Sequence, residues 1–345
     1  MFGHRRIRHS DGVAARVTTP LCRRLGIMHP VLCAGMGGLI AGPALAAAVS
    51  SAGGLGVLGL LGVPAPLIAD AIRAVRALTD RPFGVNVVLA GMTRDDIDIC
   101  LAERVPVIVS FWGDPSSYVA AAHERGTIVF AQVGSVAEAI AAVEAGVDGV
   151  IAQGVEAGGH VRGTTALSVL LPAVRAAVHP IPVIAAGGVA DGRGVAAALA
   201  LGAQAVSMGT RFLASNEAAA TDAYKARIVA AVAEDTVLTS LFDLGWPDAP
   251  HRALRNRTVA RWEAAGRPPS GSRPGEGDVI GRAPFGRAVV DLPRYSVVPP
   301  IAGYEGDVED AVLYAGESCT LVHDVRPAAE IVRAVVEEAA AILGR

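Results

Sequence analysis

The chain has 345 residues, of which 52% are hydrophobic and only 4% are aromatic, and its formal net charge is −3. This length suits one large α/β domain with an extension, or two domains. The charge gives no basic field for nucleic acid, and no stretch reaches the roughly 18 apolar residues of a membrane span. We therefore expect neither nucleic acid nor a membrane as a partner.

The four cysteines stand far apart and form no CxxC pair. They are Cys22, Cys33, Cys100 and Cys319. We interpret them as reduced thiols of a cytoplasmic protein, without a disulfide framework and without a metal site.

The first 19 residues carry Arg5, Arg6 and Arg8 but no apolar core of signal-peptide length. We expect residues 1–19 to form a disordered leader and the first domain to begin at residue 20.

From Met28 onward, short aliphatic runs alternate with longer amphipathic runs. The candidate strands are residues 30–34, 55–59, 84–89, 106–110, 127–132, 149–153, 182–186 and 205–208. The candidate helices between them are residues 43–52, 66–79, 94–103, 115–125, 135–145, 164–178 and 192–201, and an eighth helical run, 218–233, follows the last strand. The run at 66–79 shows helical spacing well, with Ile68, Ile72 and Val75 on one stripe.

This alternation leaves two folds, an open doubly wound sheet and a closed (β/α)8 TIM barrel. Eight strand–helix units over about 200 residues favour the barrel. A dinucleotide-binding sheet would need GxGxxG between its first strand and first helix. Residues 54–59 match those letters, but they lie within the second predicted strand. We predict an α/β TIM barrel over residues 20–234.

Residues 235–345 differ in character and form a predicted C-terminal extension or lid. Residues 267–275 are rich in proline and glycine, as in an exposed loop, and residues 327–343 predict a closing helix. We expect the extension to pack on or near the barrel mouth or against the outer wall. Its aromatic residues either line the mouth or only pack the extension; they are Phe242, Trp246, Trp262 and Tyr295.

Polar side chains follow several predicted strands, whose C-terminal ends meet at the mouth of a barrel. Asn86, Gln132 and Gln153 are amides at such positions. Together they could bind the polar edge of a flat heterocycle such as a flavin ring. The alternative is that each amide is a hydrogen-bonded structural group.

Glycines follow the seventh and eighth strands, where barrels commonly bind phosphate through backbone N–H groups. Gly187 and Gly188 precede the helix at residue 192, and Gly209 and Thr210 follow the eighth strand. These residues predict a phosphate site; the alternative is that the glycines only form tight turns.

His160 lies in a glycine-rich loop, residues 153–163, that follows the sixth strand. Histidine can act as acid or base near neutral pH, and neighbouring glycines let a ligand come close. The alternative is a solvated or structural histidine. Glu156 is either its partner or a surface charge. No GxSxG nucleophile motif occurs.

Several segments taken together resemble the nitronate monooxygenase (2-nitropropane dioxygenase-like) family, over about residues 20–343. They are Pro82-Phe83-Gly84-Val85-Asn86, Glu156-Ala157-Gly158-Gly159-His160, Ala185-Ala186-Gly187-Gly188-Val189-Ala190-Asp191-Gly192, Met208-Gly209-Thr210-Arg211-Phe212 and Leu313-Tyr314-Ala315-Gly316-Glu317-Ser318. The sequence departs from the family at Cys33-Ala34, where proline is common before Met-Gly, and at Val161-Arg162-Gly163 after the histidine.

The resemblance implies an FMN-binding barrel with His160 as the active-site base. The expected cofactor site comprises Gly35, Met36, Gly37, Asn86, Gln132, Gln153, Gly158, Gly159, Gly187, Gly188, Ser207, Met208, Gly209 and Thr210.

The implied reaction is the FMN-dependent oxidation of an alkyl nitronate, such as propionate 3-nitronate, by O2 to a carbonyl compound and nitrite. The alternative is an FMN-dependent NAD(P)H reductase of the same superfamily, either an enoyl-ACP reductase or a quinone reductase. A flavin- or phosphate-binding protein without turnover is a third reading. The sequence shows no interface that would set an oligomeric state.

Overall fold

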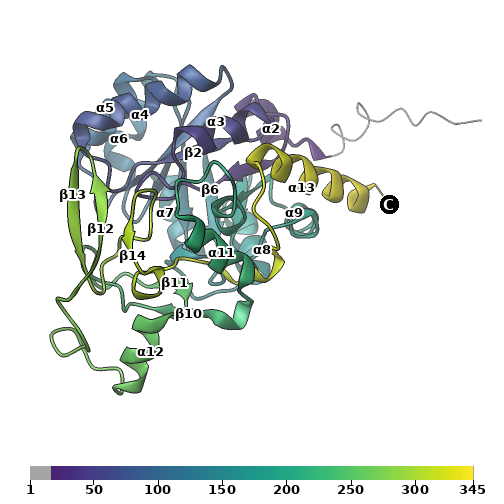
Figure 1. Ribbon diagram of the computed structural model, residues 1–345. Coiled ribbons are helices and arrows are strands. Elements are labelled where there is room, and N and C mark those ends of the chain that lie inside the picture. Colours follow the sequence, from purple (N-terminus) through teal and green to yellow (C-terminus); the bar gives the residue numbers. More distant parts are fainter. Residues whose placement is uncertain (1–16, 345) are drawn as a thin grey trace, which may run out of the picture.

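The computed structural model describes residues 17–344, and its centre is a barrel of eight parallel strands (Figure 1). The strands are β1 (Val31–Cys33), β2 (Gly56–Gly59), β3 (Phe83–Val88), β4 (Val107–Phe111), β5 (Ile128–Val133), β6 (Gly149–Gln153), β8 (Val183–Ala186) and β9 (Ala205–Met208). β9 pairs with β1, and a parallel bridge from Leu32 to Leu55 joins β1 to the start of β2. The predicted TIM barrel is therefore confirmed, and the open doubly wound sheet is excluded.

Helices cover the outside of the barrel. They are α3 (Pro43–Ser51), α4 (Ala65–Leu78), α5 (Arg94–Ala102), α6 (Ser116–Glu124), α7 (Val136–Glu144), α8 (Leu167–Ala177) and α9 (Gly192–Ala200). Polar caps set several of their starts: the Thr93 hydroxyl accepts from the Asp96 N–H, and the Asp96 carboxylate accepts in return from the Thr93 N–H. The predicted stripe of α4 is buried against the barrel.

Side chains alternate between the inside and the outside of the barrel, because successive residues of a strand point to opposite faces. On β4, Val107 and Val109 belong to the inner cluster, whereas Ile108 packs against the helices. On β3, Val85 and Val87 face the helices, so Asn86 faces inward. This register decides which strand-end residues can reach the mouth.

A short helix, α2 (Pro20–Leu25), closes the bottom of the barrel. Leu21 and Leu25 pack with the inner cluster, and the Thr19 hydroxyl caps the helix by accepting from the Cys22 N–H. Of the expected leader, residues 1–16 lie outside the described residues. Val17 is fully buried in the core.

The chain after β9 builds two small sheets and a last helix. Its elements are α10 (Thr210–Leu213), α11 (Asp222–Ala230), η1 (Ala233–Asp235), β10 (Thr236–Thr239), β11 (His251–Leu254), α12 (Arg257–Ala264), β12 (Val279–Phe285), β13 (Ala288–Pro293), β14 (Glu305–Gly306), η2 (Val308–Asp310), η3 (Glu317–Leu321) and α13 (Ala328–Leu343). β10 and β11 form a sheet with β7 (Gly159–His160), and β12 lies between β13 and β14.

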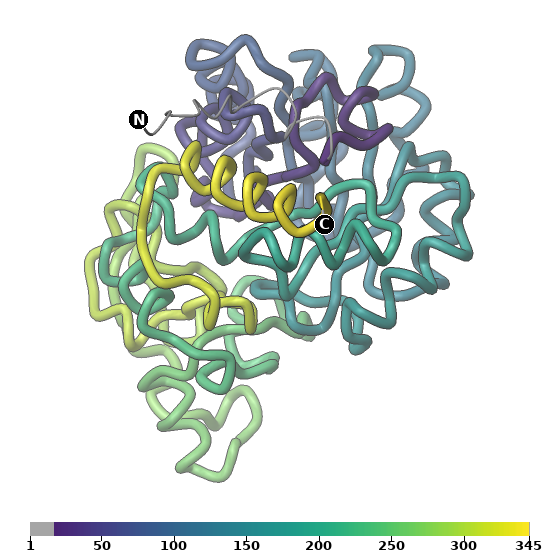
Figure 2. Tube along the Cα trace, turned by 90° about the vertical axis from the view of Figure 1, so that its right-hand side faces the viewer, coloured from purple at the N-terminus to yellow at the C-terminus, as the bar shows by residue number. Residues whose placement is uncertain are grey.

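The last helix, α13, completes the wall of the barrel. It packs against α9 and α3, and Figure 2 shows it running beside them in yellow. The eighth helix of the wall is thus α13, and not the run at 218–233 that follows the last strand directly. Helical periodicity identifies an apolar stripe, but it does not say which surface that stripe covers.

No helix within residues 17–344 is both long and apolar enough to cross a membrane.

Candidate functional site

A cavity of about 540 Å³ lies at the C-terminal ends of the barrel strands. Its size falls within the range of small-molecule and cofactor sites. Residues of the chain after β9 line it together with the strand ends, among them Trp246, Phe285, Val297 and Tyr314. The extension therefore packs at the mouth, as the sequence predicts.

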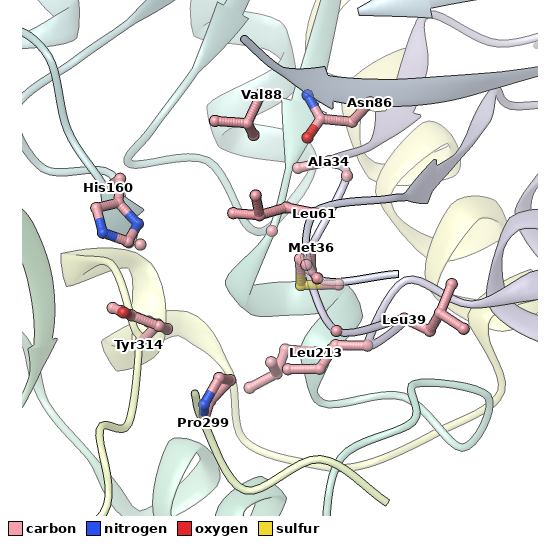
Figure 3. Close-up of a pocket in the computed structure, with 18 of the residues that line it drawn as sticks. Ala34, Met36, Leu39, Leu61, Asn86, Val88, His160, Leu213, Pro299 and Tyr314 are labelled. Carbon is pink, nitrogen blue, oxygen red and sulfur yellow. The ribbon is translucent and has the colours of Figure 1, made fainter. Parts of the chain in front are cut away.

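Most of the predicted site residues meet at this cavity. Those that line it are Gly35, Met36, Gly37, Asn86, Gln132, Gln153, Gly158, Gly159, His160, Gly187, Ser207, Gly209 and Thr210. Figure 3 shows Asn86, Met36 and His160 around the same space. The inward register of the strands brings the three amides and Ser207 together.

Two predicted site residues, Met208 and Gly188, are not among the lining residues. Met208 follows the inward-facing Ser207 by one position, so its side chain points outward and is buried in the core between barrel and helices. Gly188 has a φ of 68°, and a Cβ there would lie 3.1 Å from the Cγ of Glu156. Glycine at position 188 therefore allows the left-handed backbone turn and leaves room for the Glu156 side chain.

His160 is surrounded by rings. Its imidazole stacks on the indole of Trp246, with centroids 4.1 Å apart and planes at 26°, and Tyr314 and His251 lie at 5.5 and 5.4 Å. Its Nε2 is buried without a hydrogen-bond partner among the described residues. Burial, and then the nearby His251, lowers the pKa of His160 to about 3. The imidazole is therefore neutral at pH 7.

The loop that carries His160 is held on both sides. The Gln153 Nε2 donates to the His160 carbonyl over 2.9 Å, and the Gln153 Oε1 accepts from the Arg162 N–H. On the other side, β7 pairs with β11, with His160 opposite His251. Glu156 is not a partner of the imidazole, because its carboxylate accepts from the Leu167 N–H at the start of α8.

The loop also packs directly on the segment 313–318. A Cβ on Gly158 would lie 2.3 Å from the Gly316 nitrogen, so only glycine allows this approach. The Glu317 N–H donates to the Glu156 carbonyl over 3.0 Å, and the Gly316 N–H donates to the Thr210 Oγ1 over 3.0 Å. The two motifs, far apart in sequence, form one unit of structure.

Unused backbone donors lie beside the cavity. The N–H groups of Val189, Gly209 and Thr210 have no acceptor within residues 17–344, and all three residues line the cavity. The start of α9 is different, because the Gly192 N–H donates to the Glu338 carboxylate and the Gly194 N–H to the Asp191 carboxylate. A phosphate would therefore bind to the loops and not to the start of that helix.

Two amides on the inner face remain open toward the cavity. The Asn86 Nδ2 donates to the Val109 carbonyl over 3.1 Å, while its oxygen is turned toward the side of Ala34 and Met36 (Figure 3). Gln132 forms no side-chain hydrogen bond with the part of the chain that the structure describes, and it lines the cavity. These two groups can meet the polar edge of a ring.

Of the four aromatic residues considered in the extension, only Trp246 lines the mouth. Phe242 and Tyr295 are buried in a separate cluster, and the Trp262 Nε1 donates to the Pro268 carbonyl. Sequence reasoning missed Trp112, which does not line the cavity but supports Trp246 from behind, with the two rings edge-on at 5.0 Å. Its place directly after β4 was the signal that could have found it.

The cavity offers a single group for proton transfer at neutral pH. Within residues 17–344, no lysine, arginine, aspartate, glutamate or cysteine lines it. The hydroxyl of Tyr224 donates to the Tyr314 carbonyl, that of Tyr314 donates to the Val297 carbonyl, and burial raises the pKa of both tyrosines. His160 is the remaining acid–base group. A Schiff-base lysine or a pair of carboxylates is thus absent from this lining.

Comparison with known proteins gives consistent relatives. The family model described as nitronate monooxygenase matches residues 18–98 and 89–338. A nitronate monooxygenase of Pseudomonas aeruginosa is 34% identical, over 93% of this chain and 99% of its own. The (3aS,4S,5R,7aS)-5-hydroxy-7a-methyl-1-oxo-octahydro-1H-indene-4-carboxyl-CoA dehydrogenase of Mycobacterium tuberculosis is 41% identical, over 73% of this chain and 70% of its own. The solved structure of FabK from Thermotoga maritima is 35% identical with a TM-score of 0.77, over 95% of this chain and 98% of that one.

Proposed function

This chain belongs to the nitronate monooxygenase family and is an oxidoreductase, and on that premise we propose that it oxidises alkyl nitronates with O2, using FMN, to a carbonyl compound and nitrite. The observation that carries the proposal is the composition of the mouth cavity. It combines one neutral histidine, unused backbone donors and open amides, and it has no other group that can transfer protons at neutral pH. Such a site depends on a bound cofactor for its redox chemistry.

The residues at the mouth suit FMN. The N–H groups of Val189, Gly209 and Thr210 would hold the phosphate, and Asn86 and Gln132 would meet the polar edge of the flavin ring. Gly209 leaves space for it, because the nearest atom to a Cβ there is the Ala34 Cβ at 3.8 Å. When bound, FMN accepts the electrons of the substrate and passes them to O2.

His160 holds the reacting end of the substrate. Its imidazole is neutral at pH 7, so it can accept a proton from the carbon next to a nitro group, and its N–H can donate to the oxygen of a nitronate. The rings of Trp246 and Tyr314 exclude water from one side of the imidazole. Gln153 fixes the backbone on which the imidazole stands.

The second candidate is an FMN-dependent reductase or dehydrogenase that uses NAD(P)H. The 41% identity with the carboxyl-CoA dehydrogenase of Mycobacterium tuberculosis favours it. This candidate needs the same cofactor site. The two proposals differ in the electron donor, which is a nitronate or NAD(P)H, and in the electron acceptor, which is O2 only in the first. The cytoplasmic location expected from the cysteines belongs to both proposals; all four thiols are free and buried.

The test begins with the purified protein. Its visible spectrum and the cofactor released on denaturation should identify FMN, and nitrite should form in air from the nitronate of 1-nitrohexane. A colourless protein that FMN does not reconstitute would overturn the cofactor proposal. A flavoprotein that forms no nitrite but is rapidly reduced by NADH would establish the second candidate in place of the first.

A further inference from the structure

The part of the mouth cavity that lies away from the strand ends is lined by apolar side chains. We call this part the apolar vestibule and define it by Leu39, Leu61, Leu213, Phe285, Pro299 and Ile301. Figure 3 shows Leu39, Leu213 and Pro299 on the side of the cavity away from Asn86, with Leu61 between them and Asn86. The open polar groups lie instead at the strand ends. The cavity therefore has a polar floor and an apolar vestibule.

A charged group would find no partner in the vestibule. None of the cavity residues within 17–344 is a lysine, arginine, aspartate or glutamate, and the Tyr224 and Tyr314 hydroxyls are already used. Moving an ion from water into such surroundings without a partner is strongly unfavourable. A nitronate group avoids this cost by reaching the floor beside His160. A second charge at the other end of the substrate has no such place.

The outer wall of the vestibule comes from the β12–β13 hairpin. Its turn packs on the barrel, since a Cβ on Gly286 would lie 3.2 Å from the Pro64 Cγ and 3.6 Å from the Leu67 Cδ1. Phe285 lines the cavity although 51% of its surface is exposed. A large ring at that position shields apolar substrate atoms at the entrance from water.

We propose that the vestibule binds an uncharged aliphatic or alicyclic body of the substrate, so that the enzyme prefers such nitronates to short or carboxylated ones. This inference rests on the proposed function for the reacting end of the substrate. For the body of the substrate it rests only on the lining of the cavity.

The kinetic test compares the nitronates of 1-nitropropane, 1-nitrohexane and nitrocyclohexane with propionate 3-nitronate, on the holoenzyme. We expect kcat/KM to rise about three- to fourfold for each added methylene group, which is the transfer value of a buried CH₂. Propionate 3-nitronate should be at least about 100-fold poorer than the nitronate of 1-nitrohexane. Equal or better turnover of the carboxylated substrate would overturn the inference.

A binding test separates this inference from the proposed chemistry. Hexanamide, cyclohexanecarboxamide and succinate do not react, and calorimetry on the holoprotein measures their affinities. If no nitronate is oxidised but both amides bind at least tenfold more tightly than succinate, the proposed function fails, and the binding of an uncharged body in the vestibule stands. If succinate binds as tightly as the amides, the inference fails whatever the chemistry.

Variants of the vestibule give the third test. F285A should lower kcat/KM for the nitronate of 1-nitrohexane about tenfold and leave that of 1-nitropropane within twofold. V289A is the matched control, because Val289 lies in the same hairpin, is 53% exposed and does not line the cavity. Leu67 lines the cavity beside the turn of this hairpin, so L67K would place a positive charge next to the vestibule and should raise the relative turnover of propionate 3-nitronate at least tenfold. Equal effects of F285A on the two alkyl nitronates would contradict the proposal, and so would a failure of L67K to change the ratio.

Discussion

The imidazole of His160 lies stacked on the indole of Trp246, with ring centroids 4.1 Å apart and 26° between their planes. The histidine belongs to the loop after β6, and the tryptophan belongs to the segment between β10 and β11. The extension thus covers one face of the His160 imidazole at the barrel mouth. Burial is the first cause of the low pKa of His160.

Replacing His160 should separate proton removal from oxidation. In H160Q, turnover of a neutral nitroalkane should fall about 10²-fold or more, because no other lining group can take the proton. Turnover of the preformed nitronate, which needs no proton removal, should fall less than tenfold. Parallel oxygen-consumption assays with both forms measure this split, and the flavin spectrum shows that the cofactor is retained. Equal losses on both forms would contradict the role as a base.

Removing the stacked indole should change the acid–base behaviour of His160. In W246A, water reaches the imidazole, so its pKa should rise from about 3 toward the ordinary value of 6.5. In the pH profile of kcat/KM for a neutral nitroalkane, the acid limb should shift to higher pH by as much as the pKa of His160 rises. W246F retains a stacked ring and serves as the control. An unchanged acid limb in W246A would show that Trp246 does not set the pKa.

The same pKa makes stability depend on pH. The pKa of folded His160 is about 3, below the value of 6.5 for the unfolded chain, so the unfolded chain binds more protons between these values. The stability that neutral His160 contributes is fully present above pH 6.5, and it is lost as the pH falls from 6.5 toward 3. In H160Q, the free energy of unfolding should therefore fall less steeply between pH 6.5 and 4, in denaturant titrations at several pH values. Identical slopes in the two proteins would contradict the buried neutral state.

Replacement by alanine should have different effects on apoprotein stability at two glycines of the site. G158A should cost about 2–3 kcal/mol or more of apoprotein stability, because the Cβ would lie 2.3 Å from the Gly316 nitrogen. G209A should change apoprotein stability by less than about 0.5 kcal/mol, because Gly209 has a φ of −99° and space for a Cβ. Its Cβ would instead enter the phosphate position.

FMN affinity then distinguishes the two roles. G209A should bind FMN at least about tenfold more weakly than the unchanged protein, as measured by flavin fluorescence on reconstitution of the apoprotein. Unchanged FMN affinity in G209A would contradict the phosphate site at Gly209 and Thr210. A stable G158A apoprotein would contradict the packing role of Gly158.

Much of the fold and part of the site follow from local sequence patterns. Aliphatic runs alternating with amphipathic ones predict the barrel, and the period of two along a strand brings Asn86, Gln132 and Gln153 to one mouth. The same period explains why Met208 does not line the cavity. Its place at a strand end suggested the cofactor site, but the strand register turns its side chain outward.

The remaining features depend on contacts between distant segments. The sequence of residues 328–343 alone does not predict that this helix completes the barrel wall, because an apolar stripe can pack on any apolar surface. The stacking of Trp246 on His160 joins residues 86 positions apart through a segment without periodicity. Gly158 lines the cavity, and it also packs against the backbone of Gly316, a contact that no local pattern indicates. Such packing constraints lie in the tertiary structure and not in the pattern.

The most direct test of the central claim is an anaerobic absorbance titration of the flavin-loaded enzyme, first with the nitronate of 1-nitrohexane and then, on a fresh sample, with NADH. We predict that the nitronate reduces the flavin within the time of turnover, and that NADH reduces it slowly or not at all. Rapid reduction by NADH together with no response to the nitronate would contradict the account and identify a reductase.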